Sequence, residues 1–440
     1  MKLTFMGAGS TVFAKNVIGD VMLTDSICDC EIALYDIDAK RLEESYIMVM
    51  ALNKNINSQR AKISKYLGVE NRKDALRNAD FVVNAIQVGL YDPCTIIDFE
   101  VPKKYGLRQT IGDTMGVGGI FRALRTIPVL EDFARDMSEV CPNAWFLNYT
   151  NPMGMLTGYM QRYTGIKTVG LCHSVQGCSR GLLKDLGIDF KEPIKEKIAG
   201  INHMGWLLEI NDADGTDLYP EIRKRAVAVL EGEGRKDCRD LVRYEYIRRL
   251  GYYCTESSEH NAEYNNLFIK SKYPELIENY NIPLDEYPRR CIGQIARWES
   301  AKEDYIKGNV SHIKTKEYAS RIINSMVTDT PYKIGGNVLN KGLIDNLPKE
   351  ACVEVACLVN KYGIQPCIQG SLPVQLAAMN MTNINVQLLT IEAAATCKKE
   401  HIYQAVMLDP HASSELSIDD IIKMCDDLIE THGKWLPEYH

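Results

Sequence analysis

Residues 167–177 contain the side chains best suited to chemistry, a thiol and an imidazole placed directly after a short apolar segment. The apolar segment, Thr168 to Leu171, is predicted to form a buried strand, and Cys172 and His173 follow it. His203 comes 31 residues after Cys172. Each of these residues taken alone is more typical of a buried core position, but a thiolate and an imidazole together can bind a metal. Two protein ligands would leave positions open for substrate oxygens and water, as catalytic sites require. The thiolate by itself favours zinc.

The first residues of the chain predict a dinucleotide site. An apolar strand, Lys2 to Met6, runs into Gly7-Ala8-Gly9, and apolar residues then recur at helical spacing. A strand, a glycine turn and a helix in this order bind a pyrophosphate at the helix N-terminus. The third glycine of the usual fingerprint is replaced by Val12. The residues expected to contact the cofactor here are Gly7, Gly9, Ser10 and Thr11.

The second predicted strand, Glu31 to Tyr35, ends at two acidic residues. Asp36 is placed to bind the ribose hydroxyls of NAD, and its charge would repel the extra phosphate of NADP. The spacing of 27 residues from Gly9 is longer than the usual value of about 20. The alternative is that an aspartate here caps the next helix. We assign the ribose to Asp36 and the cap to Asp38.

Three further strands are predicted to extend the same parallel sheet, and each is followed by polar or glycine residues. They are Phe81–Ile86, Ala144–Leu147 and Thr168–Leu171. Ligands of such sheets lie beyond the carboxyl ends of the strands, which places Gln87, Asn148 and Asn151 at one crevice. We expect Gln87 and Asn148 to bind the cofactor and Asn151 to bind substrate. Turn chemistry before Pro152 is the alternative for both asparagines.

The predicted fold class is α/β, with a Rossmann-like doubly wound parallel sheet and a second α+β domain, as in the lactate and malate dehydrogenases. We place the NAD-binding domain at 1–196 and the substrate, metal-binding and oligomerisation domain at 197–440. Beyond residue 197 the pattern predicts long helices, including Arg239–Leu250 and Leu389–Cys397, with a break at Gly370–Pro373 before another helix.

Composition indicates an ordinary globular chain in a reducing compartment. The 440 residues carry a net charge of −7, which excludes the basic surface expected for nucleic-acid binding. No apolar run approaches the ~20 residues that span a membrane, and the first strand begins too early for a signal peptide. Fourteen cysteines are scattered without regular spacing. We therefore expect a cytoplasmic protein with reduced thiols, without nucleic-acid or membrane partners.

The chain resembles glycoside hydrolase family 4, the NAD-dependent glycosidases, over nearly its whole length. The motifs that carry the resemblance are Gly7–Ser10, Gly112–Gly119 with Arg122 and Arg125, Asn148–Pro152, Cys172–Val175, Ile201–Met204, Asn261–Tyr264 and Gly370–Pro373. The tetrapeptide Cys-His-Ser-Val at Cys172–Val175 is similar to the α-galactosidase branch. Branches acting on 6-phosphorylated sugars usually carry Cys-Asp-Met-Pro or Cys-Asn-Ile/Val-Pro there, which this chain lacks.

The resemblance implies hydrolysis by oxidation, elimination and addition. NAD⁺ takes hydride from C3 of the sugar, a divalent metal, usually Mn²⁺, polarises the resulting ketone, and a base removes the C2 proton. The bond from C1 to the leaving oxygen breaks, water adds, and the hydride returns. The resemblance assigns the metal to Cys172 and His203 and the base to Tyr264. The leaving-group acid is His173 or Asp113.

The implied substrate is an α-galactoside, a small molecule contacted by Asn151, Asn202 and His173. An α-galacturonide stays open because an arginine pair, Arg248-Arg249 or Arg289-Arg290, could bind its carboxylate. An α-glucoside is the other alternative within the family. A net NAD-dependent dehydrogenase and a non-catalytic NAD sensor are the alternatives outside it. We also expect a homodimer or homotetramer.

Overall fold

Six parallel strands from the first 170 residues form the part of the sheet that contains the glycine turn. They are β1 (Lys2–Met6), β2 (Glu31–Asp36), β3 (Lys62–Leu67), β4 (Phe81–Asn84), β5 (Trp145–Asn148) and β6 (Lys167–Gly170). Their order, β3-β2-β1-β4-β5-β6, is that of a doubly wound dinucleotide-binding sheet, which confirms the predicted fold class. Strand β3 was not predicted, because it is an edge strand with no buried residue and its apolar residues, Ile63, Tyr66 and Leu67, do not alternate with its polar ones. The computed structural model describes residues 1–440, apart from the side chains of Glu233 and Ile306.

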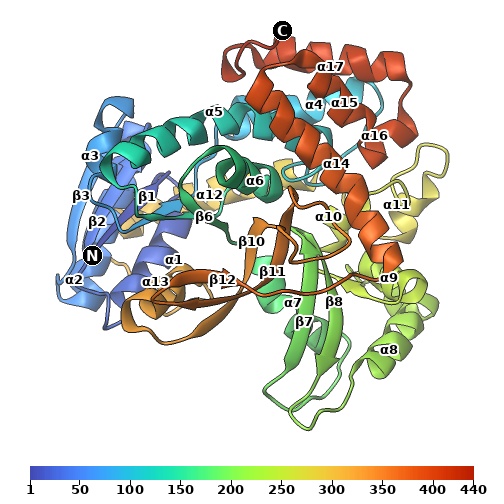
Figure 1. Ribbon diagram of the computed structural model, residues 1–440, viewed down its shortest axis with the longest axis horizontal. Helices are drawn as coiled ribbons and strands as arrows, with labels where there is room; N and C mark the ends of the chain where they lie inside the picture. Colours follow the sequence, from blue (N-terminus) through green and yellow to red (C-terminus); the bar gives the residue numbers. More distant parts are fainter.

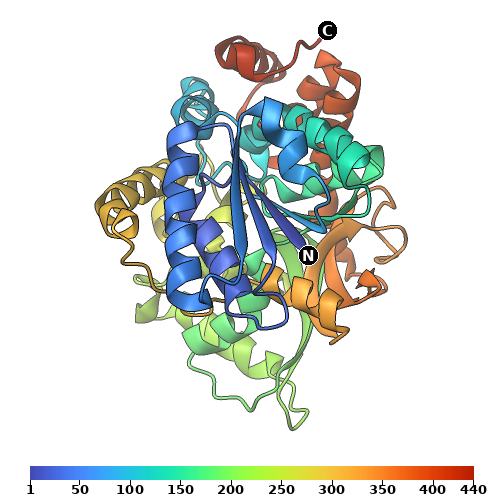
Figure 2. The same ribbon diagram turned by 90° about the vertical axis from the view of Figure 1, so that its left-hand side faces the viewer.

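Helices cover both faces of these strands, as Figure 2 shows edge-on. One face packs on α1 (Thr11–Met22) and α2 (Ala39–Asn57), with Leu3 and Phe5 of β1 in the shared core. The other face packs on α3 (Arg72–Leu76), α5 (Gly116–Val140) and α6 (Met153–Tyr163), and its core includes Val82 and Phe146. Alternate residues of each strand therefore enter opposite cores, as the two-residue period of a strand requires.

The sheet does not stop at β6 but continues through strands from the second half of the chain. These strands are β7 (Lys195–Ile201), β8 (Met204–Asn211), β9 (Tyr253–Cys254), β10 (Tyr332–Leu339), β11 (Cys352–Asn360) and β12 (Gly363–Pro366). The order onward is β6-β10-β11-β7-β8-β9, all antiparallel, with β12 paired to β11. The 196/197 domain boundary remains a prediction, and residue 196 itself lies within β7.

The last helices of the chain return to the first half, as the red and orange ribbons at the top of Figure 1 show. They are α14 (Val374–Thr396), α15 (Lys399–Met407), α16 (Pro410–Glu415) and α17 (Ile418–His432). Their apolar residues share one core with α5 and α6, and α17 also packs on α4 (Ile96–Lys104). The predicted helix 389–397 is the end of α14, which begins just after Pro373, as expected.

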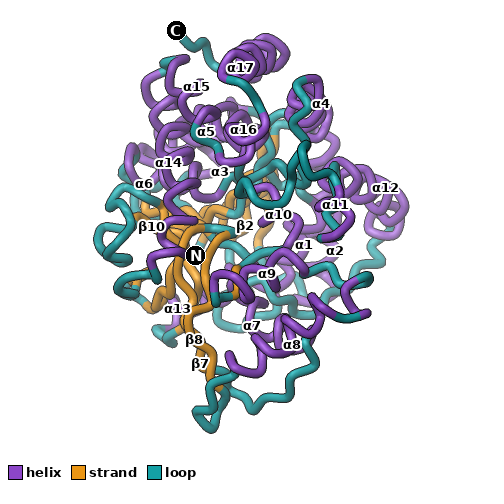
Figure 3. The backbone as a smooth tube through the Cα atoms, turned by 90° about the vertical axis from the view of Figure 1, so that its right-hand side faces the viewer, coloured by secondary structure: helices purple, strands orange, loops and turns teal.

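A third core lies beside the β7–β8 hairpin, at the lower end of Figure 3. It is formed with α7 (His173–Asp185), α8 (Tyr219–Glu231) and α9 (Leu241–Leu250), the last matching the helix predicted from residue 239. The remaining helices are α10 (Ser258–Glu263), α11 (Glu275–Asn279), α12 (Glu286–Ile306) and α13 (Ala319–Thr328). Among the described residues, none of the helices combines the length and apolarity needed to cross a membrane.

Candidate active site

Three possible metal ligands meet where β6, the β7–β8 turn and the segment before α10 come together. Cys172 precedes α7 as its N-cap residue, and His203 occupies the tight turn between β7 and β8 with φ of 62°. Glu256 lies between β9 and α10 with φ of 65°. Their ligand atoms all lie within 4.8 Å of one another. The two ligands expected from the sequence are therefore adjacent, and the structure adds a carboxylate.

Charges in this group reinforce one another. His203 Nε2 lies 3.4 Å from Glu256 Oε2. Although burial opposes the charged form, His203, His260 and Arg243 lower the pKa of Glu256 to about 2. Burial likewise opposes charge on His203, but Glu256 and Cys172 raise its pKa to about 10. A thiolate, an imidazole and an ionised carboxylate form a donor set that fits a divalent transition metal.

Tyr264, the predicted base, lies behind His203. Its hydroxyl is 3.0 Å from Nδ1 of His203, and its side chain is fully buried. A partner on the second ring nitrogen fixes the orientation of a metal-binding histidine. Burial, with Asp113, Glu263 and Glu256 nearby, raises the pKa of Tyr264 well above 10. Tyr264 thus orients His203, and its role as base remains a prediction.

Asp113 and Asn151 lie on the far side of a second histidine that the sequence reasoning did not select. Nδ1 of His260 is 3.5 Å from Glu256 Oε1, and its Nε2 is 3.9 Å from Asp113 Oδ1. The Asn151 amide donates to Asp113 Oδ2 at 3.4 Å. Burial opposes ionisation of Asp113, but Arg122 and the nearby histidines hold its pKa below the usual value. Asp113 is therefore a buried carboxylate next to the three ligands.

His173 lies at the edge of the site with a different exposure from the other groups. Its side chain is 53% exposed, and its Nε2 is 2.7 Å from Oε2 of Glu317, whose side chain is only 10% exposed. This hydrogen bond raises the pKa of His173, against the effect of burial. The hydroxyl of Tyr318 donates to the Cys172 carbonyl at 2.7 Å. Glu317 and Tyr318, two consecutive residues from the second half of the chain, therefore contact His173 and Cys172.

The glycine turn has the form expected of a cofactor cradle. Gly7 has φ of 83°, and a Cβ there would lie 2.8 Å from the Ala85 carbonyl oxygen. The Gly9 amide donates to Asp36 Oδ2 at 2.6 Å, so the carboxylate lies directly under the turn. Asp38 caps α2 by accepting from the Lys40 and Arg41 amides, which confirms that assignment.

The other residues expected at the cofactor vary in accessibility. Ser10 is the exposed N-cap of α1, and the buried Thr11 begins that helix. Gln87 is half-buried and donates to Thr95 Oγ1 at 3.4 Å. Asn148 is fully buried, and its Oδ1 accepts from the Asn84 amide at 2.9 Å. Asn148 therefore ties strand ends together, and its contact with cofactor remains a prediction.

Asn202, expected at the substrate, is also fully buried. Its amide lies 3.4 Å from Glu354 Oε1, and the Asn337 amide donates to the same oxygen at 2.9 Å. These three side chains connect β10, β11 and the β7–β8 turn. They hold His203's turn against the sheet, and substrate binding by Asn202 remains a prediction.

The arginines that left a uronic-acid substrate open are all engaged by carboxylates. Arg248 and Arg249 both bind Glu245, at 2.6 and 2.9 Å. Arg289 and Arg290 bind Glu286, and Arg290 also pairs with Glu259. These pairs reduce the capacity of the four guanidinium groups to bind a substrate carboxylate.

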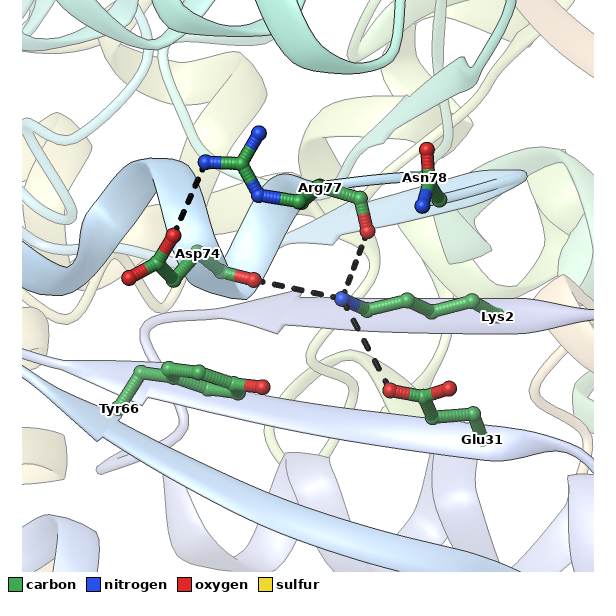
Figure 4. A pocket seen from close by; sticks show the side chains of 6 residues that line it. All are labelled: Lys2, Glu31, Tyr66, Asp74, Arg77 and Asn78. Carbon is green, nitrogen blue, oxygen red and sulfur yellow. Dashed lines mark hydrogen bonds and ion pairs between the residues drawn. The ribbon is translucent and has the colours of Figure 1, made fainter.

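A depression outside this site, shown close by in Figure 4, lies beside the first residues of β1 and β2. It measures about 350 Å³ and is lined by Lys2, Glu31, Tyr66, Asp74, Arg77 and Asn78. The Lys2 ammonium already donates to the Arg77 carbonyl at 2.8 Å and lies 3.9 Å from Glu31. Ligands of doubly wound sheets bind at the carboxyl ends of the strands, and this depression is at the amino ends.

The sequence reasoning missed three residues of the site. Glu256 and His260 both come shortly before Asn261–Tyr264, the motif from which Tyr264 was predicted as the base. Glu256 and His260 are four residues apart, a carboxylate and an imidazole close to the predicted base, and this pattern could have indicated further site residues. Glu317 had no comparable signal, since it lies in an irregular segment far from His173 in sequence.

Comparison with known proteins identifies the relatives of this chain. Residues 2–188 match the model of the family 4 glycosyl hydrolases, and residues 198–412 match the model of that family's C-terminal domain. An α-galactosidase from Bacillus subtilis (strain 168) is 60% identical over 439 residues, which cover 100% of this chain and 99% of its own. An α-galacturonidase from Thermoanaerobacter italicus is 27% identical, covering 99% and 97%.

Solved structures share the fold. A Thermotoga maritima 6-phospho-β-glucosidase, crystallised with manganese, NAD⁺ and glucose-6-phosphate, has a TM-score of 0.79 at 21% identity over the full length of both chains. A 6-phospho-α-glucosidase from gut microorganisms, in complex with NAD and Mn²⁺, has a TM-score of 0.79 at 19% identity, covering 100% of this chain and 99% of its own. The two family models and the α-galactosidase that is 60% identical over the whole chain establish that the chain belongs to family 4 of the glycosyl hydrolases.

Proposed function

We propose that this glycosidase hydrolyses α-galactosides with the help of NAD⁺ and a divalent metal, Mn²⁺. The observation that carries the proposal is the cluster of Cys172, His203 and Glu256 beside His173, at the carboxyl ends of a dinucleotide-binding sheet. The galactoside is favoured by the relative that is 60% identical over the whole chain, an α-galactosidase. Because Arg248, Arg249, Arg289 and Arg290 are already paired with glutamates, a neutral sugar is favoured over a galacturonide.

The residues of the chain fit both cofactors. Cys172, His203 and Glu256 would hold the metal, and the turn at Gly7 and Gly9 with Asp36 would hold NAD⁺. Two family members of known structure contain NAD with manganese. When bound, the metal supplies positive charge to sugar oxygens, and NAD⁺ accepts and returns a hydride at carbon.

The protein groups then have three tasks. Tyr264 keeps the His203 ring in one orientation through its 3.0 Å contact. Either Tyr264 or His260 removes the C2 proton, since both rings lie next to His203. His173 protonates the leaving oxygen, because its ring is half exposed while Asp113 is buried and engaged by Thr114 and Asn151.

A panel of nitrophenyl glycosides tests the proposal. The purified chain should hydrolyse the α-galactoside faster than the α-glucoside and the α-galacturonide. Hydrolysis should require NAD⁺, Mn²⁺ and a reducing thiol. NADH should not accumulate, because the hydride returns in each cycle. Accumulation of one NADH per substrate consumed would identify a net dehydrogenase, and preference for the galacturonide would overturn the substrate assignment.

A cytoplasmic location and a homodimeric or homotetrameric state are further parts of the proposal. The acidic composition and the free cysteines support the location. Light scattering of the purified chain tests the oligomeric state.

A further inference from the structure

The irregular segment between α12 and α13, residues 307–318, follows the surface of the cofactor-binding half of the molecule. We call it the strap. In Figure 2 helix α12 (gold) stands beside α2 (blue), and the strap leaves it toward α13 (orange). The Asn55 side chain of α2 donates to the carbonyls of Gly308 and Val310, at 3.0 and 2.9 Å. The strap is therefore tied to α2 at its beginning.

The middle of the strap is fixed to α1 by a buried carboxylate. Asp20 is fully buried and binds His312 Nε2 at 2.7 Å, the Thr315 amide at 2.8 Å and the Thr315 hydroxyl at 2.7 Å. Gly19 makes room for this contact, since a Cβ there would lie 2.5 Å from the His312 ring. Because hydrogen bonds to a buried carboxyl group are costly to break, the strap has a defined position here.

The end of the strap enters the active site. The Glu317 amide donates to the Thr315 hydroxyl at 3.1 Å, so the anchored residue also sets the direction of Glu317. Glu317 then meets Nε2 of His173 at 2.7 Å. The rings of Tyr149 and Tyr318 lie against the same imidazole, with centroids 6.0 and 6.1 Å away. One carboxylate and two aromatic rings thus confine the ring of His173.

We propose that Glu317 is a positioning residue that holds His173 as the proton donor to the leaving group. The inference rests on the proposed function and extends it to the strap. With Nε2–H donated to Glu317, Nδ1 is the nitrogen left to serve the leaving group, and among the hydrogen bonds of the described residues it takes part in none. A carboxylate behind a histidine fixes its tautomer and orientation in the same way in other enzymes.

As the C1–oxygen bond breaks, both of its electrons stay with the leaving oxygen, which takes the proton from Nδ1 of His173. The Nε2 proton remains between His173 and Glu317. His173 is then neutral, and it recovers a proton from the water that adds to the sugar.

The test compares leaving groups in Glu317→Gln, Glu317→Asp and a control, Glu303→Gln, which changes an exposed carboxylate of α12 paired with Lys307. Because general-acid help contributes ~10²–10⁴-fold, Glu317→Gln should lower kcat for methyl α-galactoside at least about 100-fold. KM should change little. Cleavage of dinitrophenyl α-galactoside, which needs little protonation, should fall less than about tenfold. Glu317→Asp should recover part of the lost rate, and the control should match the unmodified enzyme.

Equal losses on both substrates would overturn the inference, because they indicate a structural role only. Adding His173→Ala to Glu317→Gln should cause no further loss on the methyl substrate, and an additive loss would also overturn it. If the unmodified enzyme cleaves neither galactoside, the proposed function fails, and the comparison is made with the glycoside that it does cleave.

A measurement without turnover tests the pairing itself. In protein labelled with ¹⁵N-histidine, the His173 Nε2 signal should be that of a protonated nitrogen and should change in Glu317→Gln. His173→Ala identifies the signal. An unchanged Nε2 signal in Glu317→Gln would overturn the inference whatever the substrate is.

Discussion

Replacement of Glu256 by glutamine tests the metal site most directly, because this residue was identified by the structure alone. Glutamine keeps the size and one oxygen but removes the negative charge. Glu256 is ionised in the fold, with a pKa of about 2, and its Oε2 lies 3.4 Å from Nε2 of His203. The variant therefore removes the carboxylate charge from a site that keeps its thiol and imidazole.

The size of the effect has a lower limit. Loss of a side chain that only supports a metal ligand typically costs about 10–100-fold in metal affinity, and loss of a ligand should cost no less. Since every tenfold change is about 1.4 kcal/mol, we expect the binding free energy to fall by at least about 1.4–2.8 kcal/mol. Activity at saturating Mn²⁺ should recover most of its value, because the other two ligands remain.

Electron paramagnetic resonance of free Mn²⁺ gives the dissociation constant without any turnover. The matched control is Glu259→Gln, three residues further along the chain, where the carboxylate pairs with Arg290 and is not among the three ligands. Glu259→Gln should bind Mn²⁺ like the unmodified enzyme. If Glu256→Gln also binds Mn²⁺ with unchanged affinity, Glu256 is not a ligand and the reasoning from proximity is wrong.

Three further outcomes are expected. Cys172→Ser and His203→Ala should each abolish hydrolysis but keep NAD⁺ affinity within about threefold by calorimetry, since the cofactor cradle is separate; activity of both variants in EDTA would contradict the metal assignment. Product formed in deuterated water should carry deuterium at C2, and of Tyr264→Phe and His260→Gln only the variant lacking the base should lose this exchange; product without deuterium would exclude elimination. Burial raises the pKa of Glu354 to about 7, against the bonds from two asparagine amides. The fold therefore favours the neutral form of Glu354. The contribution of this residue to the free energy of unfolding is complete below its pKa in the unfolded chain, about 4.5, and is lost as the pH rises through 7. Glu354→Gln should therefore raise the free energy of unfolding at pH 8 by up to about 3 kcal/mol, seen as a higher urea midpoint, and should raise it much less at pH 5. Equal effects at both pH values would refute the raised pKa of Glu354.

The sequence by itself determined the features that depend on short stretches of chain. The strand, glycine turn and helix at 2–22 follow from apolar spacing and from a glycine where φ must be positive. Asp38 was recognisable as a cap because a cap acts on the next two or three amides. Cys172 and His203 could be proposed as ligands because one directly follows a strand whose position was predictable and the other begins a polar turn, although their role in metal binding stays a prediction.

Only the tertiary structure decided which distant side chains complete the site. Glu317 is 144 residues from His173, and Glu256 approaches Cys172 only because β9 pairs with β8 and places the following segment over the β7–β8 turn. Tyr264 was expected to be the base, and only the structure shows that its hydroxyl lies 3.0 Å from Nδ1 of His203. Local patterns report burial and turn geometry, which neighbouring residues determine. Contacts between residues far apart in sequence depend on how the strands of both halves join into one sheet, and no short pattern records that.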